Sequence, residues 1–222
     1  MVSSYLIPRT TAGITYFPYF ASMNFLGHIY LTKSDKELLL GNFMADSIKG
    51  NSYLDYSENI QKGILFHRFI DSYTDNHPTF RKSTAKLHAD FSHFSGVLVD
   101  VFYDHFLAKN WQNFHPTPLE EFAQEFYAYM EERYDVMTSK MQYIFPHMKA
   151  NNWLVRYASL EGIEKTLSEM GGRIGREYEL DKSVKNLERE YTSFERDFEV
   201  FIAAIEEATN KKRRELLLNN PT

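Results

Sequence analysis

Apolar residues recur at helical spacing along most of the chain, with no sustained strand-like alternation. This periodicity is typical of helices that bury one face. It predicts helices over residues 38–48, 57–74, 80–94, 97–108, 119–148 and 181–218, and short helical segments starting near 23 and 151. Aromatics and prolines at 111–118, and glycines at 171–176, indicate loops. The sequence therefore predicts an all-α fold with a single helical domain.

Composition narrows the class of protein without naming a function. A chain of 222 residues is long enough for one well-filled core. Its formal charge of −5 argues against general nucleic-acid binding, and it has no cysteine and no apolar run of membrane-spanning length. We expect a cytoplasmic protein. Residues 1–22 differ in composition, so we expect an N-terminal extension there and a domain over 23–222, with Met23 as a candidate true start.

The segment 97–108 is apolar on every side of a helix, yet it contains Asp100 and Asp104 one turn apart, with His105 beside them. A buried carboxylate needs a partner, so we expect a cationic group to face this pair. Either a metal ion or a pair of arginines would serve. On the second alternative His105 is an ordinary core histidine.

Three other apolar segments also carry histidine or aspartate. His28 lies in the first, Asp46 near the end of the second, and His67 and Asp71 one turn apart in the third. A histidine and a carboxylate at this spacing can share a metal, or the carboxylate can orient the histidine. Each also has a simpler interpretation: a core histidine, a surface aspartate, or an ion pair between Asp71 and Arg68.

Taken together, these segments favour a metal site, because arginine pairs would require several coincidences. Histidine with carboxylate suits Mn, Fe, Zn or Mg rather than a soft metal. Basic side chains at Lys49, Arg68 and Arg156 are candidates for meeting an anion near the metal. Metal, histidine, carboxylate and basic groups together indicate phosphate-ester hydrolysis. The sequence has no P-loop, no Gly-x-Ser-x-Gly and no His-Glu-x-x-His motif.

The same segments resemble the acyl carrier protein phosphodiesterase family. The resemblance runs in order from Met23 and is carried by the blocks Met23-Asn-Phe-Leu-Gly-His28, Gly41-Asn-Phe-Met-Ala-Asp46, Lys49-Gly50, Gly63-Ile-Leu-Phe-His-Arg-Phe-Ile-Asp71, Thr74-Asp-Asn76, Tyr103-Asp-His-Phe-Leu107 and Trp153-Leu-Val-Arg-Tyr157. It implies a helical fold related to the His-Asp phosphohydrolases and manganese dependence. The implied reaction removes 4′-phosphopantetheine from a serine of holo-acyl carrier protein, in fatty acid biosynthesis. The usual adjacent His-Asp pair reads His67-Arg68 and Asp104-His105 here.

On this basis we predict a set of roles for individual side chains. The predicted metal ligands are His28, Asp46, His67 and Asp104, with Mn²⁺ as the expected ion and Mg²⁺ or Fe²⁺ as alternatives. The predicted catalytic residues are Asp71, Arg68, Lys49 and His105, with Asp100 in support. The predicted substrate-binding residues are Arg68, Lys49, Asn76 and Arg156.

The implied partner is acidic, and so is this chain, so binding requires a local basic surface. The candidates are Arg81, Lys82 and Lys86, or Arg173 and Arg176. Two other functions stay open at this point. One is phosphohydrolysis of a nucleotide or small phosphoester, and the other is a non-catalytic helical module that binds a carrier protein. The sequence leaves the oligomeric state open.

Overall fold

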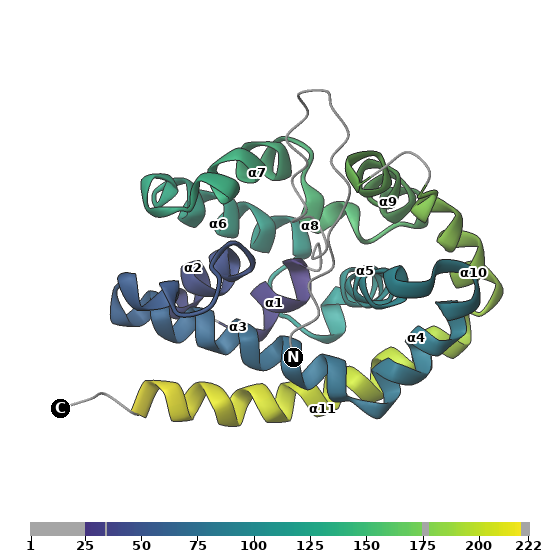
Figure 1. The fold of residues 1–222 in the computed structure, drawn as a ribbon, viewed down its shortest axis with the longest axis horizontal. Helices are drawn as coiled ribbons and strands as arrows, with labels where there is room; N and C mark the ends of the chain where they lie inside the picture. The colour runs from purple at the N-terminus through teal and green to yellow at the C-terminus, as the bar shows by residue number, and fades with distance from the viewer. Residues whose placement is uncertain (1–24, 34, 175–177, 219–222) are drawn as a thin grey trace, which may run out of the picture.

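The protein is an assembly of α-helices connected by short 3₁₀ turns (Figure 1). The computed structural model describes residues 25–33, 35–174 and 178–218, and the predicted extension 1–22 lies outside these ranges. Within them the helices are α1 (Phe25–Leu31), α2 (Lys36–Met44), α3 (Glu58–Asn76), α4 (Pro78–Phe91), α5 (Ser95–Lys109), α6 (Leu119–Glu131), α7 (Ser139–Ala150), α8 (Trp153–Arg156), α9 (Leu160–Ile174), α10 (Ser183–Arg189) and α11 (Tyr191–Leu218). The described residues contain no β-strand, which confirms the all-α prediction.

Helix α5 is the most deeply buried of the long helices, as its uninterrupted apolar sequence predicts. Leu98, Val99, Val101, Phe102 and Phe106 are all fully buried. The helix contacts α1, α4, α9 and α11. Figure 1 shows the long α11 passing along one side of the molecule beside α3 and α4. The short α1 is thereby enclosed among longer helices.

Two glycines allow α2 and α3 to cross at close range. A Cβ atom added to Gly63 would lie 2.3 Å from the carbonyl oxygen of Leu38, and one added to Gly41 would lie 2.2 Å from that of Ile60. Such distances exclude any side chain at either position. Gly41 directly precedes Asn42, and Gly63 lies one turn before His67. The close crossing of α2 and α3 therefore fixes the positions of these two polar side chains.

Several predicted boundaries were wrong, and capping residues explain some of them. The expected helix over 119–148 divides into α6 and α7, because the Thr138 side chain accepts from the N–H of Met141 and starts a new helix there. The expected helix over 181–218 is likewise divided, between Arg189 and Tyr191.

The glycine pair predicted as a loop instead continues helix α9 through Gly171 and Gly172. A Cβ at Gly171 would lie 2.4 Å from the carbonyl oxygen of Tyr178, so this glycine serves close packing rather than a turn. Among the described residues, no helix is long and apolar enough to span a bilayer.

Candidate metal centre

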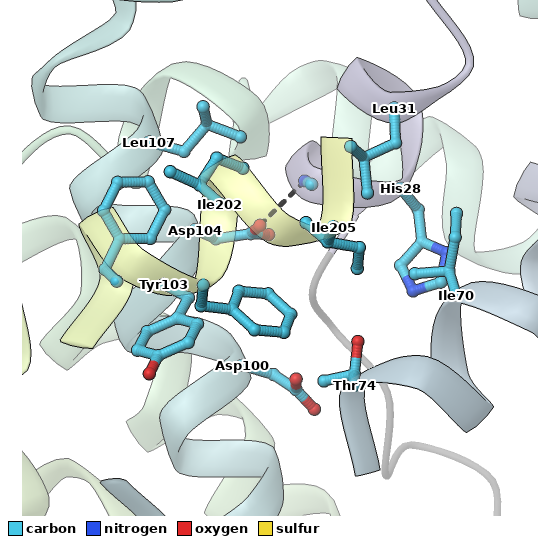
Figure 2. Close-up of a pocket in the computed structure, with 13 residues that line it drawn as sticks. His28, Leu31, Ile70, Thr74, Asp100, Tyr103, Asp104, Leu107, Ile202 and Ile205 are labelled. Carbon is cyan, nitrogen blue, oxygen red and sulfur yellow. Dashed lines mark hydrogen bonds between the residues drawn. The ribbon is translucent and has the colours of Figure 1, made fainter. Parts of the chain in front are cut away.

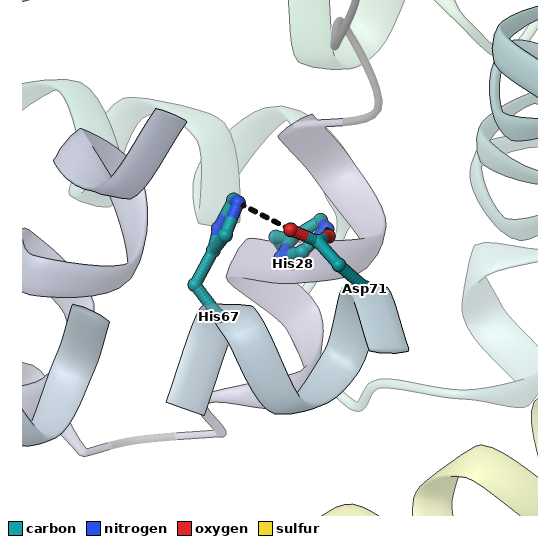
Figure 3. A group of neighbouring side chains, drawn as sticks. All are labelled: His28, His67 and Asp71. Carbon is teal, nitrogen blue, oxygen red and sulfur yellow. Dashed lines mark ion pairs between the residues drawn. The ribbon is translucent and has the colours of Figure 1, made fainter. Parts of the chain in front are cut away.

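The side chains of His28, His67 and Asp71 converge between α1 and α3 (Figure 3). One ligand-type atom from each lies within 4.8 Å of the others. The two imidazole rings stack, with centroids 4.1 Å apart and planes 29° apart. Asp46, in the 3₁₀ turn after α2, joins them because its Oδ1 lies 3.1 Å from Nε2 of His67. The structure thus brings together four residues that the sequence singled out, and we call them the His/Asp cluster.

Asn42 determines how the two histidines present their nitrogens. Its Nδ2 donates to the carbonyl oxygen of His28 at 2.8 Å, and this bond fixes the orientation of the amide. Its Oδ1 then faces Nδ1 of His28 at 3.2 Å and Nδ1 of His67 at 2.9 Å. Since an amide oxygen only accepts, both Nδ1 atoms carry the proton. Both Nε2 atoms are therefore left to face Asp71, as metal-ligating histidines require.

The charge balance of the cluster favours a cation at its centre. His67 is buried, which alone would lower its pKa, but hydrogen bonds to Asp46 and Asp71 outweigh burial and raise the pKa to about 9. Burial alone would raise the pKa of Asp71, but the contacts with His28 and His67 outweigh it and hold that pKa well below its usual value. The carboxylate of Asp71 is therefore ionised at neutral pH, and a proton on His67 supplies the positive charge.

One atom of the cluster is conspicuously unsatisfied. Nε2 of His28 is buried and has no hydrogen-bond partner among the described residues. It lies 3.3 Å from Oδ1 of Asp71, but in an orientation that does not make a hydrogen bond. A buried nitrogen without a partner is costly, and a metal ion between the two histidines and Asp71 would satisfy it. Two imidazoles with carboxylates are a donor set that fits Mn²⁺, Fe²⁺ or Zn²⁺.

Asp104 lies outside the His/Asp cluster and faces the first turn of α1 (Figure 2). Its carboxylate accepts the N–H of Leu26 at 3.0 Å and that of Gly27 at 2.8 Å. Both carboxylate oxygens are thus engaged by backbone N–H groups at the start of a helix, and the predicted role of Asp104 as a metal ligand stays a prediction. Burial raises the pKa of Asp104 to about 7, against the effect of these two bonds. Its visible role is to hold α1, and with it His28.

Asp100 lines a small cavity of about 40 Å³ together with Thr74, His28 and apolar side chains of α11. Figure 2 shows its carboxylate directed toward Thr74 rather than toward Asp104. Burial raises its pKa well above the usual value, and the nearby carboxylates of Asp71 and Asp104 add to this effect. Asp100 is thus close enough to interact with the cluster electrostatically, and its predicted supporting role stays a prediction.

His105 lies in the hydrophobic core, which matches the simpler of the two interpretations that the sequence allowed. It is buried, with Nδ1 2.8 Å from the carbonyl oxygen of Tyr157 and Nε2 2.7 Å from the hydroxyl of Tyr191. Both ring nitrogens are therefore engaged by other parts of the fold. The structure does not bring His105 into the His/Asp cluster, and it gives the predicted catalytic role no geometric support.

The two predicted basic residues nearest the cluster in the chain differ in their surroundings: Arg68 is bonded within the fold, and Lys49 is exposed. Arg68 donates through Nη2 to the carbonyl oxygens of Ile48 at 3.1 Å and Gly50 at 2.8 Å, so it braces the loop after Asp46. Lys49 is an exposed residue of that same loop. Both are close to the cluster in the chain, and their predicted catalytic and substrate-binding roles stay predictions.

The other predicted binding residues have partners within the fold. Asn76 donates to the carbonyl oxygen of Ser72 and accepts from Arg81, while Arg156 forms a two-pronged pair with Glu169 at 2.9 and 3.1 Å. Lys82 and Lys86 each lie 2.7 Å from the buried carboxylate of Asp197.

The expected basic docking surface is weakened accordingly, since one buried carboxylate offsets one of the two lysine charges. Of the second candidate surface, Arg173 lies 5.5 Å from the Trp153 ring, and Arg176 is outside the described residues.

Fold and cluster together define a class: an all-helical protein with a histidine and carboxylate centre suited to a divalent metal. Residues 23–205 match the family model described as acyl carrier protein phosphodiesterase. The chain belongs to the acyl carrier protein phosphodiesterase family.

Individual relatives agree with the family match. The acyl carrier protein phosphodiesterase of Pectobacterium atrosepticum is 33% identical over 174 residues, covering 78% of this chain and 90% of its own. That of Photorhabdus laumondii is 33% identical over 191 residues, covering 85% and 96%. That of Escherichia coli O6:H1 is 32% identical over 197 residues, covering 86% and 99%. No solved structure matches the chain.

Proposed function

We propose that this chain is a divalent-metal-dependent phosphodiesterase that removes 4′-phosphopantetheine from holo-acyl carrier protein, giving apo-carrier protein. Family membership supports the substrate class, since the relatives are named as acyl carrier protein phosphodiesterases. The observation that carries the metal dependence is the convergence of His28, His67 and Asp71, with the buried Nε2 of His28 3.3 Å from Asp71 but without a hydrogen bond. A fold relationship to the His-Asp phosphohydrolases, and a cytoplasmic location shared with the carrier protein, belong to the same proposal.

The residues of the cluster have separable tasks. His28, His67, Asp71 and Asp46 would hold the ion, with Mn²⁺ the expected one, while Asn42 keeps both Nε2 atoms directed inward. When bound, the ion supplies a Lewis acid for the phosphoryl group and activates a water molecule. Asp71 has an exposed edge, its side chain being 46% accessible. Asp71 would also serve as the proton acceptor of the reaction.

Incubation of the chain with holo-carrier protein and manganese tests the reaction directly. We expect the intact mass of the carrier to fall by one phosphopantetheine group and the released group to appear in solution. His67→Ala should abolish this loss, whereas His88→Ala, at an exposed position on α4, should leave it unchanged. An unmodified carrier mass with the wild-type chain would contradict the proposal.

The same preparation decides between this function and its alternatives. A phosphohydrolase of nucleotides or small phosphoesters would release inorganic phosphate from those compounds while leaving the holo-carrier intact. A non-catalytic binding module would retain carrier protein without changing its mass. It would also contain no stoichiometric metal when analysed after purification. The proton on His67 would then supply the positive charge of the cluster in place of a metal ion.

A further inference from the structure

A recess in the surface is lined in part by the residues that follow Asp46. This surface pocket has a volume of about 550 Å³ and is lined by two lysines, three hydroxyl side chains and an isoleucine, together with Asp55: Lys49, Lys140, Ser47, Ser52, Tyr56 and Ile48. We call it the lysine pocket. Its volume falls within the range of small-molecule sites. Lys140 did not stand out in the sequence, since it lies in the first turn of α7, far from Lys49 along the chain.

The lysine pocket is connected to the cluster through the chain itself. Ser47, in its wall, directly follows Asp46, whose Oδ1 lies 3.1 Å from Nε2 of His67. Lys140 is within electrostatic reach of Asp46 and of Lys49. Burial lowers the pKa of Lys140, Lys49 lowers it further, and Asp46 acts in the opposite direction. A ligand held in the pocket therefore adjoins a carboxylate of the proposed metal centre.

The walls of the lysine pocket are held by specific bonds. Ser47 Oγ lies 2.7 Å from Thr138 Oγ1, which ties the loop after α2 to the start of α7. Arg68, next to His67, donates to the carbonyl oxygens of Ile48 and Gly50 and lies over the Tyr53 ring at 5.0 Å. Both sides of the pocket are thus fixed before any ligand arrives, which reduces the entropy lost on binding.

The lining suits one kind of ligand. Lys49 and Lys140 repel each other, and Asp55 in the same lining and the nearby Asp46 offset part of that repulsion. A phosphate contacting both lysines lowers it further. The hydroxyls of Ser52 and Tyr56 add hydrogen-bonding groups, and Ile48 and the Tyr56 ring add apolar surface. The match is to a molecule with a phosphate at one end and a partly aliphatic chain with amide or hydroxyl groups behind it.

We propose that the lysine pocket binds the 4′-phosphopantetheine group, with Lys49 and Lys140 on its phosphate and Ile48 and Tyr56 against its aliphatic part. This inference rests on the proposed function and adds a location and a new residue, Lys140, to it. The carboxylates of the carrier protein are the alternative source of negative charge, and the experiment below separates the two.

Calorimetric titration of the full-length, manganese-supplied chain with 4′-phosphopantetheine and with pantetheine tests the assignment. Phosphopantetheine is the reaction product and survives the titration. We expect it to bind at least about tenfold more tightly than pantetheine. Lys140→Ala should weaken phosphopantetheine about tenfold and leave pantetheine unchanged. Lys149→Ala, on the same helix but paired with Glu131, should change neither. Equal phosphopantetheine affinity in wild type and Lys140→Ala would overturn the assignment.

A second readout uses the carrier protein. Apo-carrier protein should inhibit the wild type and Lys140→Ala equally, because it lacks the group that occupies the pocket. If Lys140→Ala instead weakens apo-carrier inhibition and spares phosphopantetheine, the pocket contacts carrier carboxylates and the assignment is wrong. A wild type that fails to cleave holo-carrier protein contradicts the proposed function, while the titration still decides what the pocket binds.

Discussion

Oδ1 of Asn42 accepts a hydrogen bond from Nδ1 of His67 at 2.9 Å, while Nδ2 of the same amide donates to the carbonyl oxygen of His28. One buried amide therefore sets the orientation of both histidines in the His/Asp cluster. An outer hydrogen bond of this kind commonly changes metal affinity by about 10- to 100-fold.

Asn42→Ala should weaken manganese binding by about that factor while the fold persists. The removed side chain leaves two Nδ1–H groups and one carbonyl without partners, so we also expect a loss of about 1–3 kcal/mol in the free energy of unfolding. Calorimetric titration with manganese and urea unfolding measure the two effects. Asn113→Ala, at an exposed position, is the matched control. Unchanged manganese affinity in Asn42→Ala would contradict the role of this amide.

Manganese binding should depend on pH through His67. Its pKa is raised to about 9 in the metal-free protein, so the ion must displace a proton from Nε2. We expect binding at pH 7 to release about one proton and apparent affinity to increase with pH until about 9. Calorimetry in buffers of different ionisation enthalpy counts the protons. Binding without proton release would show that His67 is not displaced.

The stability of the metal-free chain should also depend on the protonation of His67. A pKa raised from 6.5 to about 9 means that the charged form of His67 stabilises the fold fully below pH 6.5, and that this contribution is lost as pH rises through 9. Urea unfolding at pH 6, 7.5 and 9 should show this decline. In His67→Gln the decline over this interval should be smaller, and an identical pH profile would contradict the assignment.

The main effect of Asp104→Ala should be on the stability of the fold. Two backbone N–H groups of α1 lose their buried acceptor, so we expect a loss of about 1–3 kcal/mol in the free energy of unfolding. Manganese affinity should fall as a consequence, through displacement of His28. Asp71→Ala should instead abolish manganese binding directly, and it should also lower the free energy of unfolding at neutral pH, because the contacts of Asp71 with His28 and His67 are lost. Equal stability of Asp104→Ala and wild type would show that Asp104 does not hold α1.

The glycine crossing of α2 and α3 offers a test with an internal control. Gly63→Ala places a Cβ against the Leu38 carbonyl and should lower the free energy of unfolding by about 1–3 kcal/mol. Gly172→Ala lies in a helix with nothing within 4 Å of the added Cβ and should stabilise by about 0.5–1 kcal/mol. Thermal unfolding of both variants measures the contrast. An unchanged free energy of unfolding in Gly63→Ala would mean that α2 and α3 can move apart at little energetic cost.

Local patterns in the sequence predicted much of the fold. The apolar period predicted a helix over 57–74, within two residues of the observed bounds of α3, Glu58–Asn76, and the uninterrupted apolar run predicted a buried α5. The division between α6 and α7 was missed because aromatic and acidic residues continue at helical spacing across it. The single signal there is Thr138, a residue that often begins helices.

The sequence predicted only those residues of the site that have ionisable side chains. His28, Asp46, His67 and Asp71 stood out as polar residues in apolar segments, and the fold brings them together. Asn42 gave the same signal, a lone amide in the apolar α2, but an uncharged side chain attracted no assignment. The partner of Asp104 could not be predicted, because backbone N–H groups leave no trace in the sequence.

Pulsed electron paramagnetic resonance of the Mn²⁺-loaded chain tests the central claim most directly, because imidazole nitrogen bound to manganese gives a characteristic coupling. We predict this coupling in the wild type, its loss in the double variant His28→Ala/His67→Ala, and its retention in His105→Gln. Absence of the coupling in the wild type, or its survival in the double variant, would show that the two stacked histidines do not hold the metal.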